Sequence, residues 1–129
     1  MKFQADPIDA QSISGYGPGW VSVDGEKITS GLILGARGLR QAWDVNHFDE
    51  LSHEHLAALA QLDAEVMLLG CGERTRFVPP QWQAALLERR IGLECMDSFA
   101  ACRTYNILAG EGRNVVLALI QVETPADQN

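Results

Sequence analysis

The segment MDSFAACRTYNILAGEGR, residues 96–113, is the most informative part of this sequence. It follows an apolar run, and its Asp97-Ser98 pair consists of residue types that cap the first turn of a helix. A helix of small residues is expected over 99–109, and Gly110 marks its end before a further apolar run begins. The segment therefore predicts a strand, a helix and a second strand in succession.

Alternating strands and helices extend from this segment over most of the chain. Short continuous apolar runs are typical of strands that are buried on both faces. Such runs occur at 31–35, 65–70, 91–96 and 113–122. Helices are expected from the Ser52 N-cap to Leu62, and over about ten residues from Pro79-Pro80. This order of elements is that of an α/β domain.

The first 31 residues predict a β-hairpin added to that domain. Residues 20–23 alternate like a strand, and Asp24-Gly25 is a strong two-residue turn that leads into residues 26–29. We expect the whole chain of 129 residues to form one domain, because neither a linker nor a repeat divides it.

Three segments are expected to lack regular structure. The glycine-rich stretch 15–19 is expected to interrupt any helix or strand. Residues 36–50 are expected to form a loop that Trp43 and Phe48 anchor to the core. The polar tail, 123–129, is expected to fray.

The directions of the strands follow from their connections. Helical crossovers join the strands near residues 32, 67 and 94, so these three strands are expected to run parallel. The same spacing favours a parallel last strand.

The chain carries a formal charge of −7, with ten basic residues against seventeen acidic ones. This balance argues against a nucleic-acid partner, because duplex binding draws its affinity from clustered Lys and Arg. Eight of the basic residues are arginines, and six of these lie between Arg74 and Arg113. Such a bias suits planar anion recognition or a protein interface, although a GC-rich genome produces the same bias.

The cysteines and the N-terminal sequence bear on the cellular compartment. Cys71, Cys95 and Cys102 are odd in number and form no CxxC motif, so a reducing compartment is expected. The opening sequence, MKFQADPIDA, lacks the apolar run of a signal peptide. The longest apolar run, 115–120, is far shorter than a membrane span. We therefore expect a cytoplasmic protein that does not insert into a membrane.

Ligands of open α/β sheets bind beyond the carboxyl ends of the parallel strands. Those ends are expected at Gly35, at the turn that begins with Gly70, and at Asp97-Ser98, all on one edge of the sheet. In the turn, Gly70 and Gly72 allow a bound group to approach the backbone, and Arg74 offers a planar charged fork. A tight turn without a ligand explains the same glycines.

Cys71 is the best placed of the three thiols, because it lies in this glycine turn near Arg74. It has no histidine beside it in the sequence, so no nucleophile–base pair and no catalytic residue is expected. The histidines at 47, 53 and 55 lack the spacing of an HExxH zinc motif. We therefore expect neither a metal nor a cofactor.

The helix that follows Asp97 carries more hydrogen-bonding groups than a core helix needs. Arg103 and Asn106 are three residues apart and share a face. Together they could bind a carboxylate, phosphate or carbonyl group of a ligand. They could instead bond loop carbonyls and join Asp97 or Glu111 in an ion-pair network. Glu111-Gly112-Arg113 is expected to make the tight connection into the last strand.

Residues 65–120 resemble the small α/β domain shared by adipogenesis-associated Mth-like proteins and a mitochondrial respiratory complex I assembly factor. The matching pieces are 66–72, 91–98, 100–106 and 111–115, together with 31–35 and 43–45. Ser98 stands where the family more often has threonine. The resemblance implies a three-layer α/β fold with a mixed, mostly parallel central sheet and helices on both faces. It leaves the direction of the last strand open, and it implies no established catalytic residues.

Two functions follow from these observations. The first is a non-catalytic binding or complex-assembly protein that contacts another protein through the strand ends and their arginines; the assembly role is that of mitochondrial relatives, and a fold alone does not fix a function. The second is a site, enzymatic or not, for a small anionic or carbonyl ligand at the same edge. Both are compatible with a monomer or a homodimer. The candidate residues for either are Gly70, Cys71, Gly72, Arg74, Asp97, Ser98, Arg103, Asn106, Glu111 and Arg113.

Overall fold

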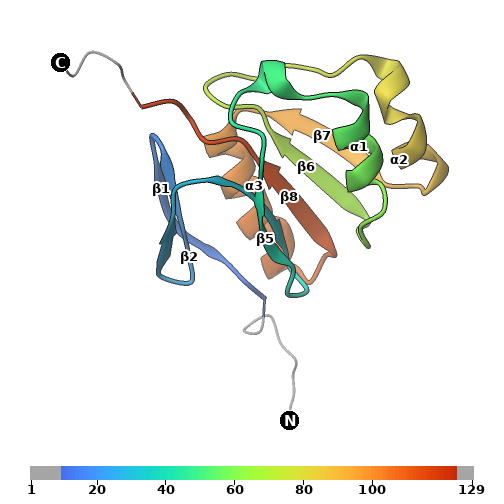
Figure 1. The fold of residues 1–129 in the computed structure, drawn as a ribbon. Helices are drawn as coiled ribbons and strands as arrows, with labels where there is room; N and C mark the ends of the chain where they lie inside the picture. Colours follow the sequence, from blue (N-terminus) through green and yellow to red (C-terminus); the bar gives the residue numbers. More distant parts are fainter. Residues whose placement is uncertain (1–9, 125–129) are drawn as a thin grey trace, which may run out of the picture.

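The continuous apolar runs form four strands of a five-stranded sheet (Figure 1). The computed structural model describes residues 10–124. Its strands are β1 (Ile13–Gly17), β2 (Trp20–Val23), β3 (Glu26–Ile28), β4 (Gly31–Gly35), β5 (Arg40–Trp43), β6 (Val66–Gly70), β7 (Gly92–Met96) and β8 (Val115–Leu119). Its helices are α1 (His53–Leu59), α2 (Ala84–Glu88) and α3 (Ser98–Gly110), with 3-10 turns η2 (Phe48–Glu50) and η3 (Pro80–Gln83).

The large sheet has the strand order β5-β4-β8-β6-β7. The last strand, β8, lies at its centre and runs parallel to β6 but antiparallel to β4. β6 in turn pairs parallel with β7. Strands β4 and β8 are buried along their whole length, which explains why they read as unbroken apolar runs. The mixed, mostly parallel sheet is therefore confirmed.

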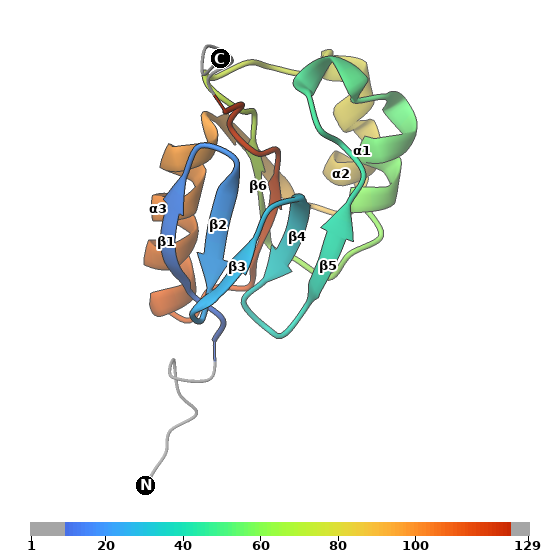
Figure 2. The same ribbon diagram turned by 60° about the vertical axis from the view of Figure 1, so that its left-hand side comes forward.

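Two layers cover the faces of this sheet, as Figure 2 shows. Side chains such as Met67, Leu69 and Val116 point toward α1 and α2 and form one core. The alternate side chains, such as Leu68 and Leu117, point toward α3 and the three-stranded antiparallel sheet β1-β2-β3, and form a second core. The expected three-layer architecture with an N-terminal β-addition is thus confirmed.

The prediction that the strand near residue 32 runs parallel to the others was wrong. Residues 40–43, expected within a loop, form β5, which turns back antiparallel along β4. Because β5 and β6 run in the same direction, the first helical crossover starts from β5 and not from β4. Gly35 pairs with Val116 and so lies at the opposite end of the sheet from Gly70.

The glycine-rich segment also differs from its prediction, because residues 13–17 form β1. This strand pairs with β2 across a bulge between Ile13 and Gly15. The ring of Trp20 lies against the strand, and a Cβ at Gly17 would come within 2.6 Å of its indole nitrogen. The glycines therefore provide space for Trp20 and do not interrupt the strand.

The helices begin close to where the sequence places them. The Ser52 hydroxyl accepts a hydrogen bond from the backbone N–H of His55 at the start of α1, which ends at Leu59, earlier than predicted. The segment from Pro80 starts as a 3-10 turn and becomes α-helical only at Ala84. No helix between residues 10 and 124 is long and apolar enough to cross a bilayer.

The two ends of the chain fall mostly beyond the part that the structure describes. Most of the N-terminal sequence used to exclude a signal peptide, residues 1–9, lies outside the described residues. The same holds for residues 125–129 of the tail that was expected to fray. That the chain forms one domain also stays a prediction.

Candidate functional site

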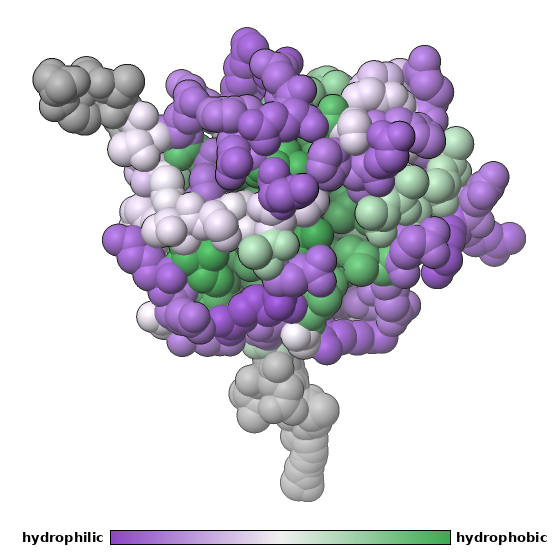
Figure 3. Space-filling view, in the orientation of Figure 1, coloured by the Kyte–Doolittle hydropathy of each residue, from purple (hydrophilic) through white to green (hydrophobic). Residues whose placement is uncertain are grey.

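The carboxyl ends of β6, β7 and β8 meet at one edge of the large sheet. We call the surface there the strand-end edge; it comprises residues 46–49, 71–77, 97–98 and 120–123. In Figure 3 the upper rim of the molecule, where these strands end, is mostly hydrophilic, with apolar side chains visible between the polar ones. Six of the ten candidate residues lie at or directly beside this edge: Gly70, Cys71, Gly72, Arg74, Asp97 and Ser98.

The hydroxyl of Ser98 joins three segments at the strand-end edge. It accepts a hydrogen bond from the backbone N–H of Gly72 at 2.8 Å and donates one to the carbonyl of Ile120 at 2.5 Å. The backbone N–H of Ser98 donates to the Gly72 carbonyl at 2.9 Å. Ser98 is buried, so its hydroxyl and the Gly72 amide are used within the protein and do not face a ligand.

Gly70 and Asp97 also have structural roles here. A Cβ at Gly70 would lie 2.8 Å from a methyl carbon of Leu119 and 3.2 Å from the Cα of Ser98, so this position requires glycine for close packing. The Asp97 carboxylate accepts from the N–H of Ala100 at 3.0 Å and caps α3. The capping role expected of the Asp97-Ser98 pair therefore belongs to Asp97.

A pocket of about 320 Å³ opens at the strand-end edge, between η2 and the loop that follows β6. Three predicted residues line it: Cys71, Gly72 and Arg74. Arg74 is exposed and makes no hydrogen bond or ion pair with residues 10–124. The remaining lining residues are Asn46, His47, Phe48, Asp49, Glu73, Arg76, Ile120, Gln121 and Glu123. This mixture of cations, acids and amides is polar, and Trp43, which is buried in the core, does not line the pocket.

Cys71 is the buried thiol in this pocket. Its S–H donates to the carbonyl of Arg76 at 3.2 Å. The pKa of Cys71 is lowered to about 7, first by a hydrogen bond from Cys95 to its thiolate, then by backbone hydrogen bonds and the guanidinium charge of Arg76, while burial opposes the shift. The same contact and burial raise the pKa of Cys95. A buried thiol whose pKa is lower than that of an ordinary cysteine therefore lines the pocket.

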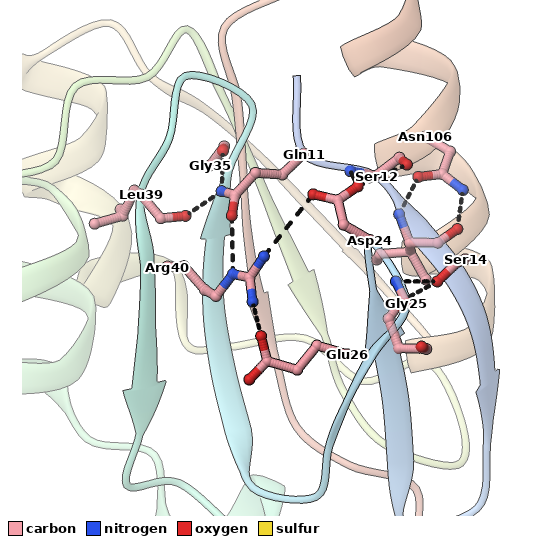
Figure 4. Close-up of polar contacts among 12 residues, drawn as sticks. Gln11, Ser12, Ser14, Asp24, Gly25, Glu26, Gly35, Leu39, Arg40 and Asn106 are labelled. Carbon is pink, nitrogen blue, oxygen red and sulfur yellow. Dashed lines mark hydrogen bonds and ion pairs between the residues drawn. The ribbon is translucent and has the colours of Figure 1, made fainter. Parts of the chain in front are cut away.

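Arg103 and Asn106 do not face the pocket; they hold α3 against β1. The Asn106 side chain accepts from the N–H of Ile13 and donates to its carbonyl, both at 2.8 Å (Figure 4). Arg103 donates to the hydroxyl of Tyr16 at 2.9 Å, and this contact raises the arginine's pKa. Of the two roles that the sequence left open, the structure shows bonding to the protein's own chain.

A second group of polar contacts joins the N-terminal addition to the large sheet (Figure 4). The amide of Gln11 donates to the carbonyls of Gly35 and Leu39 at 2.9 and 2.7 Å, and its oxygen accepts from Arg40. Arg40 also donates to Glu26 on β3 at 2.7 Å. These bonds connect the three-stranded sheet and the segment before it to the large sheet.

Glu111 and Arg113 lie beyond the carboxyl end of α3, at the end of the sheet opposite to the strand-end edge. Arg113 donates to Glu65 at 3.0 Å, and the Asn114 N–H donates to the same carboxylate at 3.1 Å. These two bonds lower the pKa of Glu65. Glu111 is exposed at the helix cap. The structure therefore does not bring these two residues together with the strand-end group.

The sequence reasoning missed pocket residues on three segments, 46–49, 73–76 and 120–123. Arg76 stacks on the ring of Phe48, 4.3 Å from its centre, and pairs with Asp49 at 2.9 Å. Recognition of β5 would have placed residues 44–49 at this edge, because a strand parallel to β6 must end there. Between residues 10 and 124, no three His, Cys, Asp or Glu side chains are grouped to hold a metal ion.

Comparison with known proteins assigns the chain to a family. Residues 13–120 match the model described as "Protein of unknown function (DUF498/DUF598)", so the chain belongs to this family. NADH dehydrogenase [ubiquinone] 1 alpha subcomplex assembly factor 3 of Bos taurus is 30% identical over 115 residues, covering 88% of this chain and 59% of that protein. An uncharacterized protein of Rhodobacter capsulatus is 34% identical over 111 residues, covering 86% of this chain and 85% of that protein. The chain spans about three fifths of the length of the curated assembly factors it matches.

Solved structures agree with this assignment. The crystal structure of a Bordetella parapertussis protein is 33% identical, with a TM-score of 0.83 and coverage of 92% of this chain and 99% of that one. The solution structure of a Mth938-like domain from Bordetella pertussis is 28% identical, with a TM-score of 0.80 and coverage of 98% and 96%. The resemblance to Mth-like proteins and to the complex I assembly factor is therefore confirmed.

Proposed function

We propose that this protein is a non-catalytic assembly factor that binds another protein through the strand-end edge. The similarity to complex I assembly factor 3 supports the proposal most directly. The partner is a protein on this proposal, and a cytoplasmic location without membrane insertion remains part of it.

The composition of the strand-end edge supports protein binding. Phe77 is 74% exposed on the loop after β6, three residues after Arg74, which makes no hydrogen bond or ion pair with residues 10–124. Exposed aromatic side chains and arginines are both enriched where proteins bind each other. The edge thus offers an apolar anchor and a planar cation on one loop.

The alternative, a small anionic or carbonyl ligand in the pocket, has weaker support. The Gly72 amide that was expected to approach a ligand already donates to Ser98. Arg76 is paired with Asp49, and three acidic side chains line the pocket: Asp49, Glu73 and Glu123. An anion would therefore depend on Arg74 in a pocket that is otherwise acidic.

Site-specific photo-crosslinking tests the proposal. A benzophenone amino acid replaces Phe77, and in a matched variant it replaces Ile107, which is 60% exposed on α3 and lies on a different element. Both variants are expressed in the native host, irradiated and analysed by mass spectrometry. The proposal expects one protein to crosslink at position 77 and not at 107.

Two controls decide the outcome. Arg74→Ala in the Phe77 background should weaken the crosslink without lowering the thermal midpoint, because Arg74 is exposed and makes no hydrogen bond or ion pair with residues 10–124. Equal adducts at both positions, or none at position 77, would contradict binding through this edge. A metabolite that raises the thermal midpoint of the purified chain, with no protein adduct, would favour the small-molecule alternative.

A further inference from the structure

Cys71 and Cys95 lie on one face of two neighbouring strands. Leu69 on β6 pairs with Cys95 on β7 in a parallel ladder. Cys71 follows two residues after Leu69, so its side chain points to the same face. The backbone N–H of Cys71 donates to the Met96 carbonyl at 2.8 Å, which keeps residue 71 aligned with β7. Both thiols belong to the core region beneath α1 and α2, where Cys71 is buried and Cys95 packs against the same cluster of apolar side chains.

One of the two thiols lines a pocket, and the other is partly exposed. Cys71 is only 3% exposed, but it lines the pocket that opens at the strand-end edge. Cys95 is half-buried on β7, which is the last strand in the order of the sheet. The third thiol, Cys102, is 1% exposed, packs in the other core and does not line this pocket.

We propose that Cys71 and Cys95 form a hydroperoxide-sensitive dithiol that closes reversibly to a disulfide. In the first step the Cys71 thiolate attacks a peroxide oxygen; an S–O bond forms, the O–O bond breaks, and the leaving oxygen departs as water or an alcohol after protonation. In the second step the Cys95 sulfur attacks the Cys71 sulfur, an S–S bond forms, the S–O bond breaks and water leaves. Two thiols are oxidised to one disulfide, and the peroxide is reduced.

The surroundings of the two thiols assign the order of these steps. Cys71 lines the pocket, and backbone hydrogen bonds and the nearby charge of Arg76 help to lower its pKa, so it is the thiol that attacks the peroxide. Cys95 does not line the pocket, and burial contributes to its raised pKa, so it acts second, as the resolving thiol. Burial raises the pKa of Cys102 to about 12, so this residue is an internal control that should not react. The proposal does not depend on what the strand-end edge binds.

The test is oxidation of the reduced full chain with hydrogen peroxide, followed by alkylation of free thiols and peptide mapping without reductant. We expect an intrachain link between Cys71 and Cys95, with Cys102 alkylated, and full reversal by dithiothreitol. In Cys95→Ser, oxidation should stop at a sulfenic acid on Cys71 that dimedone traps. In Cys71→Ser, no link should form and Cys95 should stay reduced.

Other outcomes overturn the proposal. Three outcomes would exclude the proposed dithiol of Cys71 and Cys95. They are oxidation of Cys102 at the same rate as Cys71, disulfide links between two chains, and a pair that stays reduced after peroxide treatment. Dimedone capture on Cys95 as fast as on Cys71 would exclude the assigned order. If a serine variant does not fold, the time course of the three thiols in the unsubstituted chain decides alone.

Discussion

The strand-end edge and the seam between α3 and β1 are both rich in polar side chains, but they use them differently. At the seam, Asn106 and Arg103 form hydrogen bonds within the protein. Asn106 bonds to Ile13, 93 positions earlier in the sequence, and Arg103 bonds to Tyr16, 87 positions earlier. At the edge, Ser98 does the same, whereas Arg74 and the Cys71 thiol face a pocket. A high number of polar side chains on a helix therefore does not by itself identify a binding site, because the same side chains can form hydrogen bonds within the protein.

The largest expected effect on stability is that of Ser98→Ala, which tests whether the hydrogen bonds of Ser98 hold the strand-end edge together. The variant leaves the buried Gly72 N–H and the Ile120 carbonyl without partners. We expect a loss of about 3 kcal/mol in the free energy of unfolding, because each unsatisfied buried group costs roughly 1–3 kcal/mol. Urea denaturation measures it. Ser98→Thr is the matched control and should keep most of the stability, because threonine retains the hydroxyl.

Asn106→Ala is the corresponding test at the seam and should have the next largest effect. It removes both hydrogen bonds to the backbone of Ile13, which is part of β1. We expect a loss of about 2 kcal/mol, somewhat less than for Ser98 because the Asn106 contacts are only partly buried. The neighbouring Ile107→Ala, at an exposed position, should change stability by less than about 0.5 kcal/mol. If both variants behave alike, Asn106 does not hold β1.

The elements that the sequence could predict are those with a local pattern, whereas contacts between residues far apart in the sequence could not be predicted. The strands β4, β6 and β8 were predictable because burial on both faces leaves a continuous apolar run. Strand β5 was not, because only Trp43 of its four residues is buried, and the reversal that β5 introduces changed the direction assigned to β4. The clustering of Gly70, Cys71, Gly72, Arg74 and Ser98 followed from parallel strands ending together. The partners of Asn106 did not, because the residues it bonds are 93 positions away and no local pattern specifies them.

The thiols sharpen the comparison, because Cys71 belongs to the edge and Cys102 to α3. Alkylation of Cys71 by iodoacetamide should rise with pH as the thiolate forms, with a midpoint near its pKa of about 7. Cys102, with a pKa of about 12, should stay unreactive over the same range. Cys95→Ala removes the hydrogen bond that lowers the Cys71 pKa, so the midpoint should move upward and alkylation near pH 7 should slow by on the order of tenfold. Cys95→Ser retains a donor and should restore part of the shift; an unchanged midpoint in Cys95→Ala would contradict this account.

The smallest effect on stability is expected for substitutions of two exposed arginines, Arg74 at the strand-end edge and Arg103 at the seam. These two substitutions should differ in their effect on partner binding. Arg103→Ala removes one exposed hydrogen bond to Tyr16, and Arg74→Ala removes no hydrogen bond or ion pair to residues 10–124, so neither should move the urea midpoint measurably. Capture of a protein partner from the native host should fall for Arg74→Ala and stay unchanged for Arg103→Ala, because only Arg74 lies at the strand-end edge. An equal loss of partner capture in both variants would mean that the binding surface also covers the seam. Arg103 would then bind the partner despite its hydrogen bond to Tyr16. A loss in Arg103→Ala alone would place the binding surface on α3 and remove the strand-end edge from the proposed function.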